Sequence, residues 1–217
     1  TCLGATYDEL GDYAKARDML ERALAVQERE YGSDHTEVAA TLTALGATYD
    51  ELGDHAKALD MLERALVILE RAHGPDSTIV GHALVNLGEV HIDNGDAREA
   101  FEFLQRALAI FEENVGHDHV YVAFPLRGLG NAHRDLGDAP KSLELLERSL
   151  VIIERHFGPE NVDVAQTRRD LGKTHVVLSD VAAARSQLQR AVEIYEAKFG
   201  ADHRDTCRCR ETLASLQ

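Results

Sequence analysis

The 217-residue chain has a formal charge of −15, from 38 acidic and 23 basic side chains, and is 44% apolar but only 6% aromatic. A surface this acidic repels phosphate backbones and anionic lipids, so the composition disfavours nucleic acid and membranes as partners. The chain has three cysteines, and their irregular spacing argues against a disulfide framework. A chain without a disulfide framework is expected in a reducing compartment, so we expect a cytoplasmic location.

A short motif that begins with Leu-Gly recurs along the chain, always at the same spacing. Its glycines lie 42 residues apart, at Gly4, Gly46, Gly88, Gly130 and Gly172. Residues 3–35 and 45–77 are identical at 24 of 33 positions. A fixed period of this length is typical of a repeat protein. We expect an array of closely related copies that continued upstream of Thr1.

The second copy shows what one repeat contains. Its first apolar stripe follows the spacing of an amphipathic helix, at Val38, Leu42, Leu45, Tyr49 and Leu52. A second stripe of the same kind runs through Ala58, Leu62, Ala65, Leu66 and Leu69. Gly53 and Asp54 separate the stripes, as a helix stop and the N-cap of the next helix. Each repeat is therefore predicted to be helix, tight turn, helix and loop.

The spacing predicts one array over the whole chain. Its expected repeats are residues 1–33 (partial), 34–75, 76–117, 118–159 and 160–201, followed by a terminal helix at 202–217.

The chain resembles the tetratricopeptide repeat. The matching residues are the Leu-Gly-x-x-Tyr of the first helix, as at Leu45, Gly46 and Tyr49, and the small residues Ala58 and Ala65 of the second. The usual repeat has about 34 residues. The longer period here, with Gly-x-Asp-His loops such as residues 32–35, resembles the kinesin-light-chain type. This resemblance implies an all-α, right-handed superhelical solenoid of antiparallel helix pairs, with peptides bound in a concave groove lined by the first helices.

The groove positions of this family select a set of candidate ligand-binding residues. They are Arg127, Asn131, Arg134, Arg169 and Lys173, together with Asn86 and Phe124. Cations on the wall of a concave site focus potential and can hold a carboxylate or phosphate. The expected partner is therefore a protein or peptide, with an acidic peptide as one alternative.

Three interpretations of the basic residues remain open. Arg127 and Asn131 match the clamp with which co-chaperone repeats grip a terminal carboxylate, and Arg208 falls at a third clamp position. Asp170 stands where that clamp has Asn, and its charge would repel the ligand. The alternatives to a clamp are a general site for acidic peptides and a solvated charged face without a ligand.

No motif in the sequence supports catalysis, a metal or a cofactor. Gly172, Lys173 and Thr174 resemble the end of a phosphate-binding loop, but they fall within a predicted helix, whose amides are already bonded. The loop histidines, such as His119, are expected to cap helices rather than bind metal. We expect a non-enzymatic interaction scaffold. A sensor or autoinhibitory array of a larger NTPase or effector protein, or an oligomerisation module, is the alternative.

Overall fold

The computed structural model describes residues 13–216, and it is helical throughout, without a strand in that range. The helices are α2 (Tyr13–Tyr31), α3 (Thr36–Glu51), α4 (His55–His73), α5 (Thr78–Asp93), α6 (Ala97–Val115), α7 (Val120–Asp135), α8 (Ala139–Phe157), α9 (Val162–Val177), α10 (Val181–Phe199) and α11 (Arg204–Ala214). The predicted all-α fold class of helix pairs is confirmed. The first copy of the Leu-Gly motif, at Leu3 and Gly4, lies outside the described residues. So do Gly11 and Asp12, which match the Gly53-Asp54 turn one repeat earlier, and Cys2, the first of the three cysteines.

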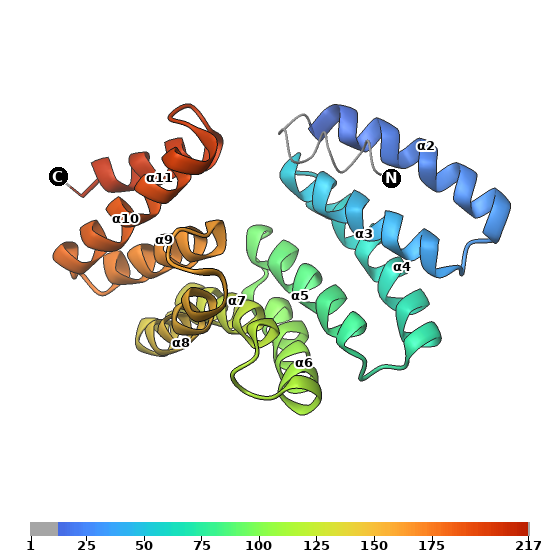
Figure 1. Cartoon of the computed structure of the whole chain (residues 1–217), viewed down its shortest axis with the longest axis horizontal. Coiled ribbons are helices and arrows are strands. Elements are labelled where there is room, and N and C mark those ends of the chain that lie inside the picture. Colours follow the sequence, from blue (N-terminus) through green and yellow to red (C-terminus); the bar gives the residue numbers. More distant parts are fainter. Residues whose placement is uncertain (1–12, 217) are drawn as a thin grey trace. The chain divides into compact units, whose positions relative to one another are not determined.

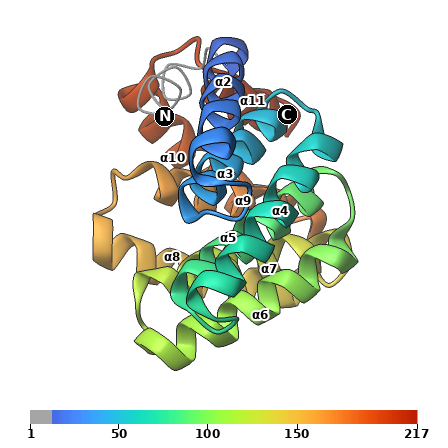
Figure 2. The ribbon, with the colours of Figure 1, turned by 90° about the vertical axis from the view of Figure 1, so that its right-hand side faces the viewer.

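The chain divides into two compact units, Thr1–Asn114 and Val115–Gln217, here called unit 1 and unit 2. In unit 1, α3 packs against α4 and α5 against α4 (Figure 1). Figure 2 shows α3, α4 and α5 of this unit from the side. In unit 2, α7 packs against α8, α9 against α10, and α11 against α10. The boundaries of the five repeats and of the terminal helix, expected from the spacing, stay a prediction. The second of these repeats, 34–75, contains α3 and α4.

The helix ends follow the turn residues of the repeat. Gly53 has φ 78°, which a residue with a side chain adopts only at a cost, and α3 ends just before it. Asp54 then caps α4, because its carboxylate accepts a hydrogen bond from the Lys57 amide at 3.3 Å. Ser179 replaces glycine in the fifth repeat and still has φ 61°. The turn geometry is thus retained at Ser179 at some conformational cost.

The histidines of the Gly-x-Asp-His loops cap the first helix of their repeats. Nδ1 of His35 accepts from the Glu37 amide at 3.2 Å, and Nδ1 of His119 accepts from the Tyr121 amide at 3.2 Å. His203 does the same for Asp205 at 3.3 Å. The capping role expected for these loops is confirmed, because each imidazole satisfies an amide that the helix leaves without an intrahelical partner.

In the described copies of the Leu-Gly motif, at Gly46, Gly88, Gly130 and Gly172, the glycine brings two helices of a repeat into close contact. A methyl group added at Gly46 would lie 2.5 Å from Cγ of Leu62, and one added at Gly88 would lie 2.5 Å from Cγ of Leu104. Leu62 and Leu104 are buried, as is Tyr49. The motif therefore persists because the leucine of the second helix occupies the space that a larger residue would need.

Two residues that depart from the repeat pattern are accommodated locally. Pro125 lies inside α7, yet α7 begins at Val120, the position at which α9 begins one repeat later, so the proline does not delay the helix. Arg168 stands where Leu42 packs, and its guanidinium donates to Gln187 at 2.8 Å and pairs with Glu154. Among residues 13–216, no helix combines the length and apolar character needed to cross a bilayer.

Candidate functional site

Unit 1 contains a pocket of about 430 Å³ between α3, α4 and α5. Its lining residues are Thr36, Glu37, Ala40, Thr43, Leu69, His73, Ile79, His82, Ala83 and Asn86. A volume of this size falls in the range of small-molecule and side-chain pockets. Asn86 is the one predicted site residue that lies in it. Leu69 and His73 belong to α4, a second helix. The sequence analysis did not predict them as site residues, because the groove positions of the family lie only on the first helices.

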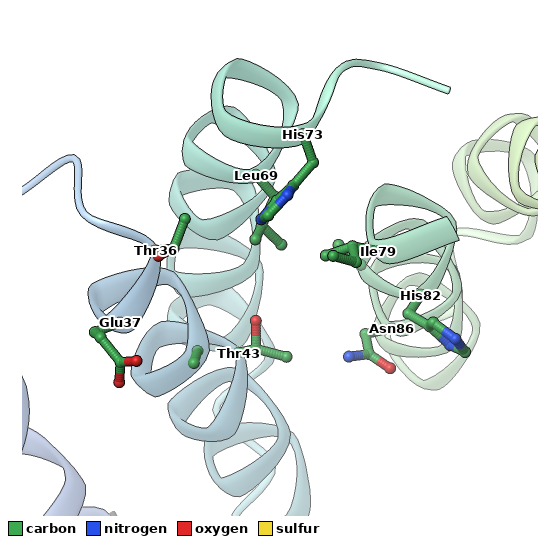
Figure 3. Close-up of a pocket in the computed structure, with 10 residues that line it drawn as sticks. Thr36, Glu37, Thr43, Leu69, His73, Ile79, His82 and Asn86 are labelled. Atoms are coloured by element: carbon green, nitrogen blue, oxygen red, sulfur yellow. The ribbon is translucent and has the colours of Figure 1, made fainter. Parts of the chain in front are cut away.

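The pocket has an apolar end and a polar end. Leu69, His73 and Ile79 surround one end in Figure 3. At the other end Asn86 extends from α5 toward Thr43 on α3. Ile79 is 44% exposed, so an apolar surface is open to solvent at this point. This combination suits an apolar group that carries a neighbouring hydrogen-bonding group.

The Thr43 hydroxyl at the edge of the pocket keeps some hydrogen-bonding capacity. The Thr43 hydroxyl donates to the Ala39 carbonyl at 2.9 Å, which leaves its oxygen able to accept. His82 packs against Phe111 with ring centroids 4.9 Å apart, and burial lowers the pKa of His82. Glu37 and His82 point away from the gap between α3 and α5 in Figure 3. The groups that face this gap are therefore mainly uncharged.

Four basic residues of unit 2 form what we call the cation cluster: Arg127 and Arg134 on α7, and Arg169 and Lys173 on α9. Arg127 donates to the side-chain oxygen of Gln166. Arg134 donates to the side-chain oxygen of Asn131 at 2.8 Å and to Asp135 at 3.0 Å. The structure thus joins Arg134 to Asn131 on one helix. Phe124 lies half-buried on α7, three residues before Arg127.

Asp170 links the two helices of the cation cluster. Its side chain is 4% exposed, and it accepts a hydrogen bond from the Asn131 amide at 3.1 Å. Nε of Arg169 lies 3.3 Å from the other Asp170 oxygen, and the Arg169 guanidinium also lies 3.7 Å from Asp205 of α11. The chain's own carboxylates therefore compensate part of the positive charge that the sequence placed here.

The electrostatics of Asp170 reflect these neighbours. Burial by itself raises the pKa of a carboxyl group, but Arg169, Lys173 and Arg127 together hold the pKa of Asp170 below its usual value. Burial alone would lower the pKa of the Arg169 guanidinium, and Asp170 raises it instead. Both groups are therefore charged at neutral pH. The sequence alone indicated only a repulsive carboxylate, because its partners come from α7 as well as α9.

The model of the tetratricopeptide repeat family matches residues 1–71, 51–113, 79–150 and 121–197. No curated protein sequence matches the chain significantly. Among solved structures, BtubC (BKLC) from P. vanneervenii is 25% identical with a TM-score of 0.68, over 91% of this chain and 79% of that one. A kinesin-light-chain-like protein of Podosopora anserina with nearly identical TPR-like repeats is 21% identical, with a TM-score of 0.66 over 91% and 93%.

A third similar structure holds a peptide. The Rap conjugation gene regulator of the plasmid pLS20, solved in complex with the Phr* peptide, is 16% identical with a TM-score of 0.81. The match covers 99% of this chain and 56% of that one. At this identity the likeness shows the fold alone. The repeat pattern, the helix pairs and the family match agree over most of the chain, and its neighbours include kinesin-light-chain repeats. The chain therefore belongs to the tetratricopeptide repeat family.

Proposed function

We propose that the chain is a protein-interaction scaffold that holds a peptide segment of a partner protein, and that it performs no catalysis. The observation that carries this proposal is the pocket of about 430 Å³ between α3, α4 and α5. Pockets of this kind, apolar with a few convergent polar groups, are the usual form of a ligand site. A similar fold is known with a peptide, the Phr* complex of the Rap regulator, which supports a peptide as the kind of partner.

The proposed fit in unit 1 follows from the two ends of the pocket. An apolar side chain of the peptide occupies the end formed by Leu69 and Ile79, and its burial supplies most of the affinity. The Asn86 side chain has both a donor and an acceptor, so it can bond the N–H and the C=O of one peptide residue. The main-chain bonds then fix the register of the peptide and the apolar pocket selects its side chain.

In unit 2 the candidate ligand-binding residues remain Arg127, Asn131, Arg134, Arg169, Lys173 and Phe124. We propose that the cation cluster holds an acidic side chain of a bound peptide. The internal contacts of Arg169 with Asp170 and Asp205 reduce its net attraction, so this site contributes specificity more than affinity. The three-residue match to a terminal-carboxylate clamp gains no support, because Asp170 occupies the cluster with its own carboxylate.

Selection from a random peptide library on phage tests the proposal. The immobilised protein is expected to enrich peptides with a large apolar residue at one position. Ala40→Trp should fill the pocket from an exposed position on α3 and weaken binding of the enriched peptides about tenfold or more. Ala56, an exposed alanine on α4 outside the pocket, provides the matched control, and Ala56→Trp should bind as the parent does. Equal binding by all three proteins would reject the pocket.

Two alternatives keep their own tests. An oligomerisation module would show a concentration-dependent mass in sedimentation equilibrium, and neither Ala40→Trp nor Asn86→Ala would change it.

A sensor or autoinhibitory array would be indicated by an NTPase motif in sequence upstream of Thr1. The cytoplasmic location, inferred from the cysteine spacing, stays a prediction.

A further inference from the structure

Both oxygens of the Asp170 carboxylate have partners within the chain, one an amide and the other a guanidinium. It accepts from Asn131 at 3.1 Å and pairs with Arg169 at 3.3 Å. Lys173 and Arg127 also act on it electrostatically. An anion bound by this cluster would need the same groups, because cations and amide N–H groups are what stabilise a carboxylate.

The fold itself does not require a carboxylate at this position. The equivalent position in the three preceding repeats is occupied by Gly128, Asn86 and Ala44. All three lie in the first helix of their repeat, as Asp170 does. A negative charge at this position is therefore particular to α9 among α3, α5, α7 and α9. It coincides with the place where Arg127, Arg169 and Lys173 are brought together.

We propose that Asp170 sets the ligand specificity of the cation cluster: it is a resident counter-ion with which an acidic side chain of the ligand must compete. This inference rests on the proposed function of unit 2 as an acidic-peptide site. With Asp170 charged, the cluster binds single carboxylates weakly and requires further contacts from the ligand. Without that charge, the cluster loses its most deeply buried internal carboxylate and can bind an acidic group of the ligand more tightly.

The size of the effect follows from the charges involved. Two unit charges about 7 Å apart interact by a few kcal/mol at the effective dielectric constant of a partly buried site, before screening by salt. Removing the Asp170 charge should therefore raise the affinity for an acidic probe about tenfold or more. Asp170→Asn keeps the shape of the side chain and leaves Arg169 its second partner, Asp205.

The experiment measures binding of a fluorescein-labelled hexa-aspartate peptide by fluorescence polarisation at neutral pH and low salt. The proteins are the parent chain, Asp170→Asn and Asp135→Asn. Asp135 is the matched control, because it also pairs with a cation of the cluster but is 38% exposed at its rim. Asp170→Asn is expected to bind the peptide at least tenfold more tightly than the parent, and Asp135→Asn to differ from the parent by less than about threefold. Adding Arg127→Ala to Asp170→Asn should remove most of the gain.

Each outcome is decisive for this inference. Equal gains in the two single variants would show a general effect of net charge and overturn it, as would a gain that survives Arg127→Ala. Binding by Asp170→Asn but not by the parent supports the inference while rejecting acidic peptides as natural ligands. Tight binding by the parent without a gain in Asp170→Asn would overturn the inference while supporting acidic peptides as ligands of unit 2. If circular dichroism shows Asp170→Asn to be unfolded, Asp170→Ser replaces it, and unfolding of both would make Asp170 a folding residue instead.

Discussion

The Arg106 guanidinium on α6 lies 2.7 Å from the Glu70 carboxylate on α4. One repeat earlier, Arg64 lies 2.7 Å from Glu28, in the same relation between the second helices of successive repeats. The Arg106 and Glu70 side chains are 39% and 31% exposed. The period of the sequence therefore recurs as a ladder of ion pairs that joins neighbouring repeats in unit 1.

A double-mutant cycle measures what one such ion pair contributes. We expect Arg106→Ala and Glu70→Ala to be coupled by about 0.5–1 kcal/mol in the free energy of urea unfolding, as is usual for partly exposed pairs. The coupling should shrink at high salt, because ions screen exposed charges. Coupling that is absent at low salt would mean that the pair adds nothing to the packing of the repeats.

A second prediction concerns the close contact at Gly88. Gly88→Ala should destabilise the protein by about 1–3 kcal/mol, because the new methyl group would overlap Leu104 at 2.5 Å. The double variant Gly88→Ala, Leu104→Ala restores the space and should lose less stability than the sum of the two single changes. Thermal or urea unfolding followed by circular dichroism measures all three. Additive losses would show that Leu104 does not set the requirement for glycine.

Ser179 offers a site at which the protein can be stabilised. Its φ of 61° is costly for serine, and the glycines at the equivalent turns, such as Gly137 with φ 91°, adopt this region freely. Ser179→Gly should raise the free energy of unfolding by about 0.5–1 kcal/mol, part of the relief being offset by the greater entropy of the unfolded chain. The reverse change, Gly137→Ser, should lower it. A loss of stability in Ser179→Gly would indicate a role for the serine side chain.

The pH dependence of stability should report the state of Asp170. Its pKa in the folded protein is lowered, so the folded state binds this proton less tightly than the unfolded chain does. The resulting stabilisation is complete above the unfolded pKa of about 3.9 and is lost as the pH falls through the lower folded value. Urea unfolding between about pH 3 and pH 7 measures this contribution. The difference in the free energy of unfolding between the parent and Asp170→Asn should be constant near neutral pH and should decline only at the acid end. A difference independent of pH would place the effect in packing rather than charge.

The fold could be predicted from the sequence because its rules are local and repeated. Gly53 and Asp54 predict a turn because glycine adopts a positive φ and aspartate caps a helix. The same pair recurs in other repeats, so the pattern did not arise by chance. The roles of residues in the site were less accessible. Asp170 was expected to oppose a ligand in an otherwise basic groove, whereas the structure shows that Arg169 and Asn131 already hold it. The pocket was missed for a similar reason, since Leu69 and His73 reach it from α4, outside the predicted groove positions.

Isothermal titration calorimetry of one library-selected peptide tests the central claim most directly. The parent chain and Ala56→Trp should bind the peptide with the same affinity, while Ala40→Trp should bind at least tenfold more weakly. Asn86→Ala should lose about 1–3 kcal/mol of binding free energy through unpaired peptide groups. Replacing the apolar residue of the peptide by alanine should weaken its binding to the parent. The same replacement should not weaken binding to Ala40→Trp any further, because the pocket is already filled in that variant. If Ala40→Trp binds the peptide as tightly as the parent does, the pocket between α3, α4 and α5 is not where this protein holds its partner.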